Sequence, residues 1–133
     1  MSNESPKAQV ERLYELLTSG DYEAARGLLH PDYRSNTQPH ETSPDALFAE
    51  IEAVKQTITS LERETVFTME DGDMGVILQR VQGIDKDTGE RIAYRSADFF
   101  RMGDDGRLTE HWDAVTFEGN DLFDTIDLGS DST

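Results

Sequence analysis

The chain of 133 residues contains no cysteine, only three lysines and no long apolar run. Without cysteine it can form neither a disulfide framework nor a cysteine-based zinc site, and it has no thiolate nucleophile. No apolar run approaches the ~18 residues of a membrane span, and the N-terminus lacks the basic-then-apolar pattern of a signal peptide. At ~100–200 residues per domain, we expect a single domain. Because these targeting patterns are lacking, we expect it in the cytoplasm.

Acidic residues dominate the composition: 28 Asp and Glu face 12 Lys and Arg, which leaves a net charge of -16. This charge argues against binding to DNA, RNA or an anionic membrane, whose phosphates attract basic residues. Such acidity fits either a disordered chain or a folded core beneath an acidic surface. Periodic apolar segments and an aromatic share of 8% favour the folded core. An acidic, lysine-poor surface is also typical of a halophilic protein, because salt screens its self-repulsion.

Two positions combine a serine cap with a proline at the first helical position, Ser5-Pro6 and Ser43-Pro44. Apolar residues recur at helical spacing after each of them. The pattern predicts helices over residues 6–19 and 44–61.

A short helix is expected after Asp21, with Leu29 on its apolar face and His30-Pro31 at its end. Residues 31–42 are rich in polar residues and proline. They predict a loop with a short strand near Tyr33.

After residue 61 the pattern changes to segments rich in β-branched and aromatic residues, separated by turn sequences of Gly and Asp. Short connections imply antiparallel neighbours. The fold class is therefore α+β, with helices packed on one face of a four-stranded meander. We expect one domain over 1–117 and an acidic C-terminal tail over 118–133. The predicted strands are 62–70, 74–84, 90–102 and 107–117.

The last hairpin brings chemically active side chains together. A tight turn at residues 103–106 would place Asp98 opposite His111 and Ser96 opposite Asp113. Because side chains alternate along a strand, all four would project from one face of the sheet. A loop one residue longer or shorter would move His111 and Asp113 to the other face.

Tyr94 and Phe117 share that face, which suits a pocket or a core better than solvent. Burying a lone carboxylate is costly unless it is paired or protonated, and Asp98 with His111 would make such a pair. A carboxyl group desolvated beside a second acid has a raised pKa and can take up and return a proton. Asp113 is the candidate for that role. A cross-strand Asp–His pair can equally be a purely structural contact, so both interpretations stay open.

The segment 96–113 resembles a hallmark of SnoaL-like proteins, the polyketide-cyclase branch of the nuclear transport factor 2-like superfamily. That family shows a strand with Asp-x-Phe-Arg, a turn with Asp-Gly-Lys/Arg and a strand with Glu-His-Trp-Asp. The corresponding residues here are Asp98-Phe99-Phe100-Arg101, Asp105-Gly106-Arg107 and Glu110-His111-Trp112-Asp113. Gly20-Asp21-Tyr22 and residues 29–33 are similar to the family's transition from helix to strand.

The resemblance implies a cone-shaped α+β barrel, in which a curved antiparallel sheet wraps the N-terminal helices and leaves a deep pocket. It implies no metal or organic cofactor, and often a homodimer. It also implies that Asp113 is the acid–base of an intramolecular aldol ring closure. Relatives often carry His-Asn-Pro-His after the first short strand. This chain has residues 36–40, Asn-Thr-Gln-Pro-His, so the first histidine of that pattern is missing.

Three functions are consistent with these residues. In the first, a cofactor-independent cyclase or isomerase-type lyase binds a small apolar carbonyl compound, and Asp113 removes a proton while His111, held by Asp98, assists. In the second, the same scaffold is a non-catalytic ligand-binding or assembly module. In the third, the same acid serves a hydrolase or isomerase reaction on another substrate. The expected ligand-binding residues are Tyr33, Asn36, Tyr94, Ser96 and Phe117. The three histidines lack the spacing of a zinc site, so we expect no metal.

The halophilic interpretation has a direct test. We expect the chain to unfold in dilute buffer and to refold in molar salt, because salt screens the repulsion among its acidic residues. Far-ultraviolet circular dichroism across a series of potassium chloride concentrations measures this. Full stability without salt would contradict the interpretation.

Overall fold

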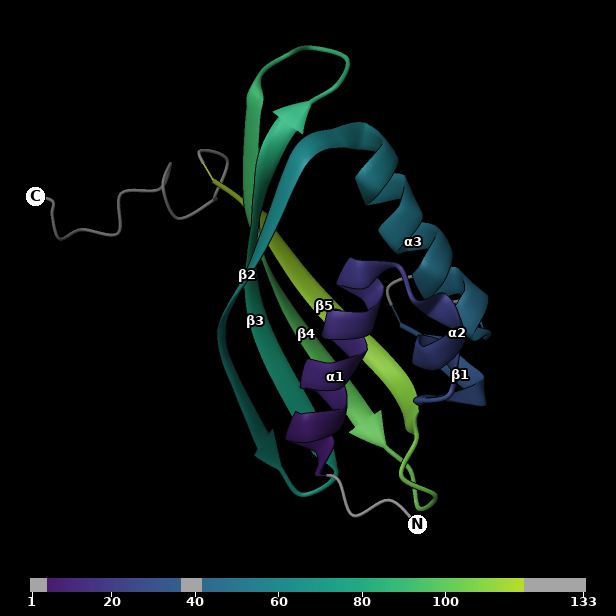
Figure 1. Cartoon of the computed structure of the whole chain (residues 1–133). Helices are drawn as coiled ribbons and strands as arrows, with labels where there is room; N and C mark the ends of the chain where they lie inside the picture. Colours follow the sequence, from purple (N-terminus) through teal and green to yellow (C-terminus); the bar gives the residue numbers. More distant parts are fainter. Residues whose placement is uncertain (1–4, 37–41, 119–133) are drawn as a thin grey trace, which may run out of the picture.

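The computed structural model describes residues 5–36 and 42–118. Five strands form one curved sheet in the order β1-β5-β4-β3-β2, and three helices lie together on one side of it (Figure 1). This confirms the predicted α+β class. The elements are α1 (Pro6–Ser19), α2 (Tyr22–Arg26), β1 (Leu29–Ser35), α3 (Pro44–Thr57), β2 (Ile58–Asp71), β3 (Met74–Asp85), β4 (Arg91–Met102) and β5 (Leu108–Phe117).

Both serine–proline signatures begin helices as predicted. The Ser5 hydroxyl accepts a hydrogen bond from the amide of Ala8, and the Ser43 hydroxyl accepts one from the amide of Asp45. Each bond satisfies a donor that the first turn would leave unpaired. At the other end of α1, Gly20 adopts φ 83°, a left-handed conformation that often ends helices. Glycine adopts it without the steric strain that a Cβ atom would cause.

Two helix ends differ from the prediction. The helix expected to reach residue 61 stops at Thr57, and Ile58 already pairs with Asp85 in the sheet. Residues 57–59 are Thr-Ile-Thr, whose β-branched side chains favour a strand, while the apolar spacing continues across the boundary by coincidence. The short helix stops at Arg26, three residues before Leu29.

Leu29 begins β1 instead of lying on a helix, so His30-Pro31 belongs to a strand. This strand runs parallel to β5 at the edge of the sheet. The pairing is interrupted between Leu29 and Arg34, which is where Pro31 lies. Proline lacks an amide donor and is tolerated in an edge strand at such an interruption. The strand predicted near Tyr33 is therefore confirmed.

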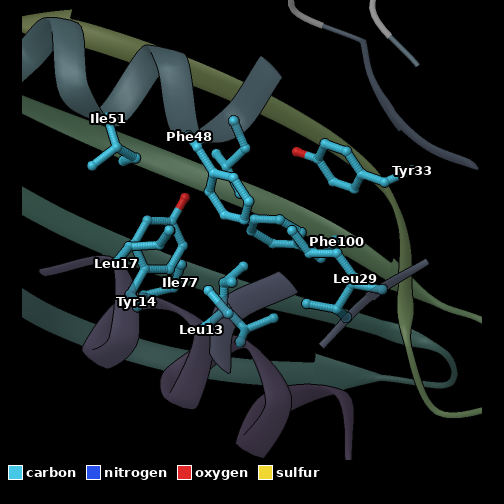
Figure 2. Close-up of a cluster of buried hydrophobic side chains, with 13 residues drawn as sticks. Leu13, Tyr14, Leu17, Leu29, Tyr33, Phe48, Ile51, Ile77 and Phe100 are labelled. Carbon is cyan, nitrogen blue, oxygen red and sulfur yellow. The ribbon is translucent and has the colours of Figure 1, made fainter. Parts of the chain in front are cut away.

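The hydrophobic core fills the space between the helices and the sheet. Tyr33 and Phe100 are completely buried, and Phe100 meets the ring of Tyr14 edge to face at 6.0 Å (Figure 2). Gly75 of β3 allows α1 to approach closely, since a Cβ there would lie 2.7 Å from the carbonyl oxygen of Pro6. The helices therefore cover one end of the inner sheet face.

The register of the last hairpin differs from the prediction by two residues. Asp98 lies opposite Asp113, and Phe100 lies opposite His111. The predicted tight turn spans residues 103–106, but the Gly103 amide donates a hydrogen bond to the carbonyl of Arg107. The turn is therefore one residue longer than predicted. The register then shifts once more next to the turn, as in a β-bulge. Two shifts of one residue restore the alternation, so the predicted face is retained while the predicted partners are not.

No helix among the residues that the structure describes is both long and apolar enough to cross a membrane. The acidic tail predicted over residues 118–133 lies outside the described residues, apart from Glu118.

Candidate functional site

A cavity of about 560 Å³ lies between α1, α3 and the inner face of strands β2 to β5. Its volume falls in the range of small-molecule sites. Apolar atoms make up most of the exposed surface of its wall, with polar groups gathered among them. The apolar lining includes Ile51, Val54, Ile58, Ile92, Val115 and Phe117, and the polar lining includes Tyr14, Glu50, Arg63, Gln79, Tyr94, Ser96, Asp98 and Asp113.

Five of the eight predicted site residues line this cavity: Tyr94, Ser96, Asp98, Asp113 and Phe117. The rings of Tyr94 and Phe117 lie 5.3 Å apart, and Phe117 is 42% exposed. Burial raises the pKa of Tyr94, so its hydroxyl stays protonated and can donate a hydrogen bond.

Asp98 is the centre of a buried polar network. Its Oδ1 lies 2.8 Å from Nε2 of His111. Its Oδ2 accepts hydrogen bonds from the Ser96 hydroxyl at 2.8 Å and from the Gln79 amide at 3.2 Å. A carboxylate that is only 3% exposed thus has three polar partners, as a buried charge requires. These contacts orient Asp98 rather than leave it available to a ligand.

His111 lies behind the cavity surface and is 1% exposed. Its ring stacks on Phe100 at 4.4 Å, and the Tyr33 ring lies 6.4 Å away. Nδ1 of His111 and the hydroxyl of Tyr33 are both buried without a hydrogen-bond partner among the described residues. His111 can therefore position Asp98, but it does not line the cavity.

The structure places two predicted ligand-binding residues elsewhere. Tyr33 is fully buried in the core, with its hydroxyl directed inward toward Phe48 (Figure 2). Burial, with Glu50 and other acids nearby, raises its pKa. The amide of Asn36 donates to the carbonyl of His111, and its side chain reaches Glu110. Neither residue is part of the cavity wall.

Five polar residues of the cavity are absent from the predicted site: Tyr14, Glu50, Thr57, Arg63 and Gln79. Gln79 was detectable, because it interrupts the buried apolar row of β3 at a position that alternation directs inward. Arg63 gave no signal, because the register of β2 shifts on both sides of it. Tyr14 lies on the apolar stripe of α1, and that pattern by itself indicates a core position.

Glu50 extends from α3 toward the acids of the sheet and is half-buried. Burial is the main reason that its pKa is raised. His111 lowers this pKa, whereas Asp113 and Asp98 raise it. The cavity therefore holds an acid on each of its two walls, and the one on the helix takes up a proton more readily than an exposed glutamate.

Asp98, His111 and Asp113 could each offer a cation one ligand atom, and these atoms lie within 4.8 Å of one another. A cation bound there would compete with the contact between Nε2 of His111 and Asp98. The donor set thus favours a hydrogen-bonded polar network over a preformed metal site.

Comparison with known proteins identifies similar chains. A family model described as a SnoaL-like domain matches residues 10–111. A SnoaL-like polyketide cyclase from Agrobacterium tumefaciens has a similar structure, with a TM-score of 0.73 and 10% identity, covering 85% of this chain and 92% of that one. No curated protein sequence matches the chain significantly.

Two further solved structures share the fold. A nuclear transport factor 2-like protein from Burkholderia thailandensis has a TM-score of 0.72 and 15% identity, covering 85% of this chain and 92% of its own. TsrD from Streptomyces laurentii has a TM-score of 0.71 and 24% identity, covering 84% of this chain and 91% of its own. At these identities the similarity establishes the fold alone.

The raised pKa of Glu50 predicts a stability effect with a defined sign. A carboxyl group whose pKa is raised by folding destabilises the folded state wherever it is ionised. Glu50→Gln should therefore stabilise the protein at neutral pH. The gain should vanish as pH falls through the raised pKa toward the ordinary value of ~4.3.

Urea unfolding at a series of pH values measures this difference. Glu15→Gln, at an exposed position of α1, is the matched control and should show no such pH-dependent gain. Equal stability of Glu50→Gln and the unmodified chain at neutral pH would contradict the assignment.

Proposed function

Because the chain belongs to the SnoaL-like domain family, we propose that its cavity binds a small, largely apolar carbonyl compound and moves a proton on it. The reaction would be an aldol-type ring closure or an isomerisation. One observation carries this proposal: Asp113 lines an apolar cavity directly opposite Asp98, whose carboxylate is already held by three polar partners. Asp113 lines the cavity and stands at the position that the family resemblance gives to the acid–base, so we assign the proton transfer to Asp113.

In the proposed reaction, Asp113 takes a proton from the carbon next to a carbonyl group of the ligand. The electron pair of the C–H bond moves toward the carbonyl oxygen and forms an enolate. In a ring closure, the enolate carbon attacks a second carbonyl group of the same molecule and a C–C bond forms. Asp113 then returns its proton to the new alkoxide, so that atoms and charge balance.

The enolate oxygen needs a hydrogen-bond donor in the low-dielectric cavity. Tyr14 supports this role, because it lines the cavity and its pKa is raised well above the ordinary value by burial, with a contribution from Asp98. Its hydroxyl therefore remains protonated at neutral pH. His111 and Asp98 are positioning residues in this scheme. Tyr33 and Asn36, two of the ligand-binding residues expected from the sequence, lie outside the cavity wall, so we assign the donor role to Tyr14.

A non-catalytic ligand-binding or assembly module is the second candidate, and the outer face of the sheet favours assembly. Phe67 and Met69 of β2 are 47% and 55% exposed. They pair with Leu78 and Val76 on the side of the sheet away from the helices. Exposed apolar side chains of this kind mark association surfaces.

The catalytic proposal predicts proton exchange on a model ketone. In D₂O, the chain should accelerate deuterium incorporation next to the carbonyl of 2-tetralone, a two-ring ketone that is mostly apolar. Asp113→Asn should reduce this rate about 10²–10⁴-fold while the dissociation constant of the ketone changes little. Mass spectrometry and calorimetry measure the two quantities.

Asp104→Asn, in the exposed turn between β4 and β5, is the matched control and should exchange at the unmodified rate. Full exchange activity in Asp113→Asn would refute the mechanism. Tight binding of the ketone without any exchange by the unmodified chain would favour the non-catalytic module.

The outer face generates a separate prediction. We expect a homodimer in solution, as the family resemblance implies, with Phe67 and Met69 in its interface. Sedimentation velocity should show the dimer, and Phe67→Lys with Met69→Lys should convert it to a monomer. A dimer unchanged by both substitutions would place the interface elsewhere.

A further inference from the structure

Among the described residues that line the cavity, Arg63 is the one Lys or Arg, and it lies on the strand farthest from Asp113. Its guanidinium lies 5.7 Å from the centre of the Tyr14 ring, and Nη1 donates a hydrogen bond to Oε1 of Gln79 at 3.1 Å. The Tyr14 ring and the Gln79 amide therefore hold the guanidinium at the cavity surface.

The partners of Arg63 are neutral, although the chain is rich in acids. Four other arginines, all near the surface, form ion pairs with carboxylates: Arg26, Arg80, Arg101 and Arg107. Arg63 takes part in none of the ion pairs among residues 5–36 and 42–118. Its positive charge is thus not neutralised by direct contact with an acid of the described chain.

The cavity is consequently polarised from one side of the sheet to the other. Arg63 lies on β2, Gln79 on β3, Asp98 on β4 and Asp113 on β5, with the Gln79 amide linking the cation to Asp98. At ~4.8 Å between neighbouring strands, the backbones of β2 and β5 are separated by roughly 14 Å. Arg63 has a long side chain and Asp113 a short one, so a ligand of one or two rings can span the space between them.

We propose that Arg63 is an anion-binding subsite and that the ligand of this cavity is a carbonyl compound with a carboxylate group. The proposal rests on the proposed function and narrows its substrate class. A guanidinium can bind a carboxylate through two parallel hydrogen bonds, an interaction that is strong in a low-dielectric site. The net charge of -16 repels anions from the surface as a whole, so a local cation is needed for one to bind.

The subsite would also orient the ligand. A carboxylate at Arg63 lies on the β2 side of the cavity, three strands from Asp113, whose charge would repel it. The other end of the molecule, with its carbonyl group, then points toward Asp113. Binding energy at a remote group is thereby used to place the reacting carbon beside the base.

A different role for Arg63 is to balance the acids of the cavity without touching a ligand. A matched pair of probes separates the two roles: 2-naphthoate, and 2-acetylnaphthalene, in which a methyl group replaces one carboxylate oxygen. Calorimetry would give the dissociation constant of each probe. We expect the chain to bind the naphthoate more tightly.

Arg63→Gln should raise the dissociation constant of 2-naphthoate about 10- to 100-fold. It should change the dissociation constant of 2-acetylnaphthalene by no more than about twofold. Arg63→Lys, which keeps the charge without the planar fork, should retain part of the preference. Arg80→Gln is the control, because it removes the same charge from the opposite face of the sheet, where Arg80 pairs with Glu118. It should change neither constant.

Three results would overturn the proposal. If Arg63→Gln and Arg63→Lys both weakened the binding of the two probes equally, the role of Arg63 would be structural. If Arg63→Gln bound 2-naphthoate as tightly as the unmodified chain and still bound the neutral probe, the anion subsite would be refuted. The proposed function would not be affected. Failure of the unmodified chain to bind either probe would remove both.

Discussion

The burial of the Asp98 carboxylate is the constraint around which the inner face of the sheet is arranged. A buried carboxylate without partners is costly, because water no longer solvates its charge. Here Ser96, Gln79 and His111 supply that solvation from three strands. Gln79 in turn accepts a hydrogen bond from Arg63, so one buried acid determines polar positions on four adjacent strands.

This network separates the core from the cavity. On the core side, the ring of Phe100 stacks on His111 and excludes water from it. On the cavity side, Asp113 remains at the surface among apolar side chains, with Glu50 on the helix that closes the space. The low dielectric that makes burial of Asp98 expensive also strengthens each charge that a ligand would meet. Stability and chemistry thus depend on the same packing.

In the hairpin of β4 and β5, the sequence pattern predicted which side chains share a face but not which residues pair. Alternation along β4 and β5 correctly predicted that Ser96, Asp98, His111 and Asp113 share a face. It assigned the wrong partners, because a longer turn and a register shift beside it each moved the pairing by one residue. Side chains alternate faces with a period of two residues, so two shifts of one residue leave each side chain on its predicted face. The same two shifts move each residue's cross-strand partner by two positions. The motif identified the chemistry of the strand, and the turn decided which groups meet.

The amino-acid sequence by itself determined the local features: the capped starts of α1 and α3, the meander of strands and the acids of the last hairpin. These follow from short-range rules of capping, periodicity and turn chemistry. Only the tertiary structure decided that α3 stops at Thr57, that Tyr33 and Asn36 lie outside the cavity wall, and that Glu50 and Arg63 line the cavity. Those outcomes depend on which strand pairs with which and on how a helix packs across the sheet. Such contacts between distant segments leave no periodic trace in the chain.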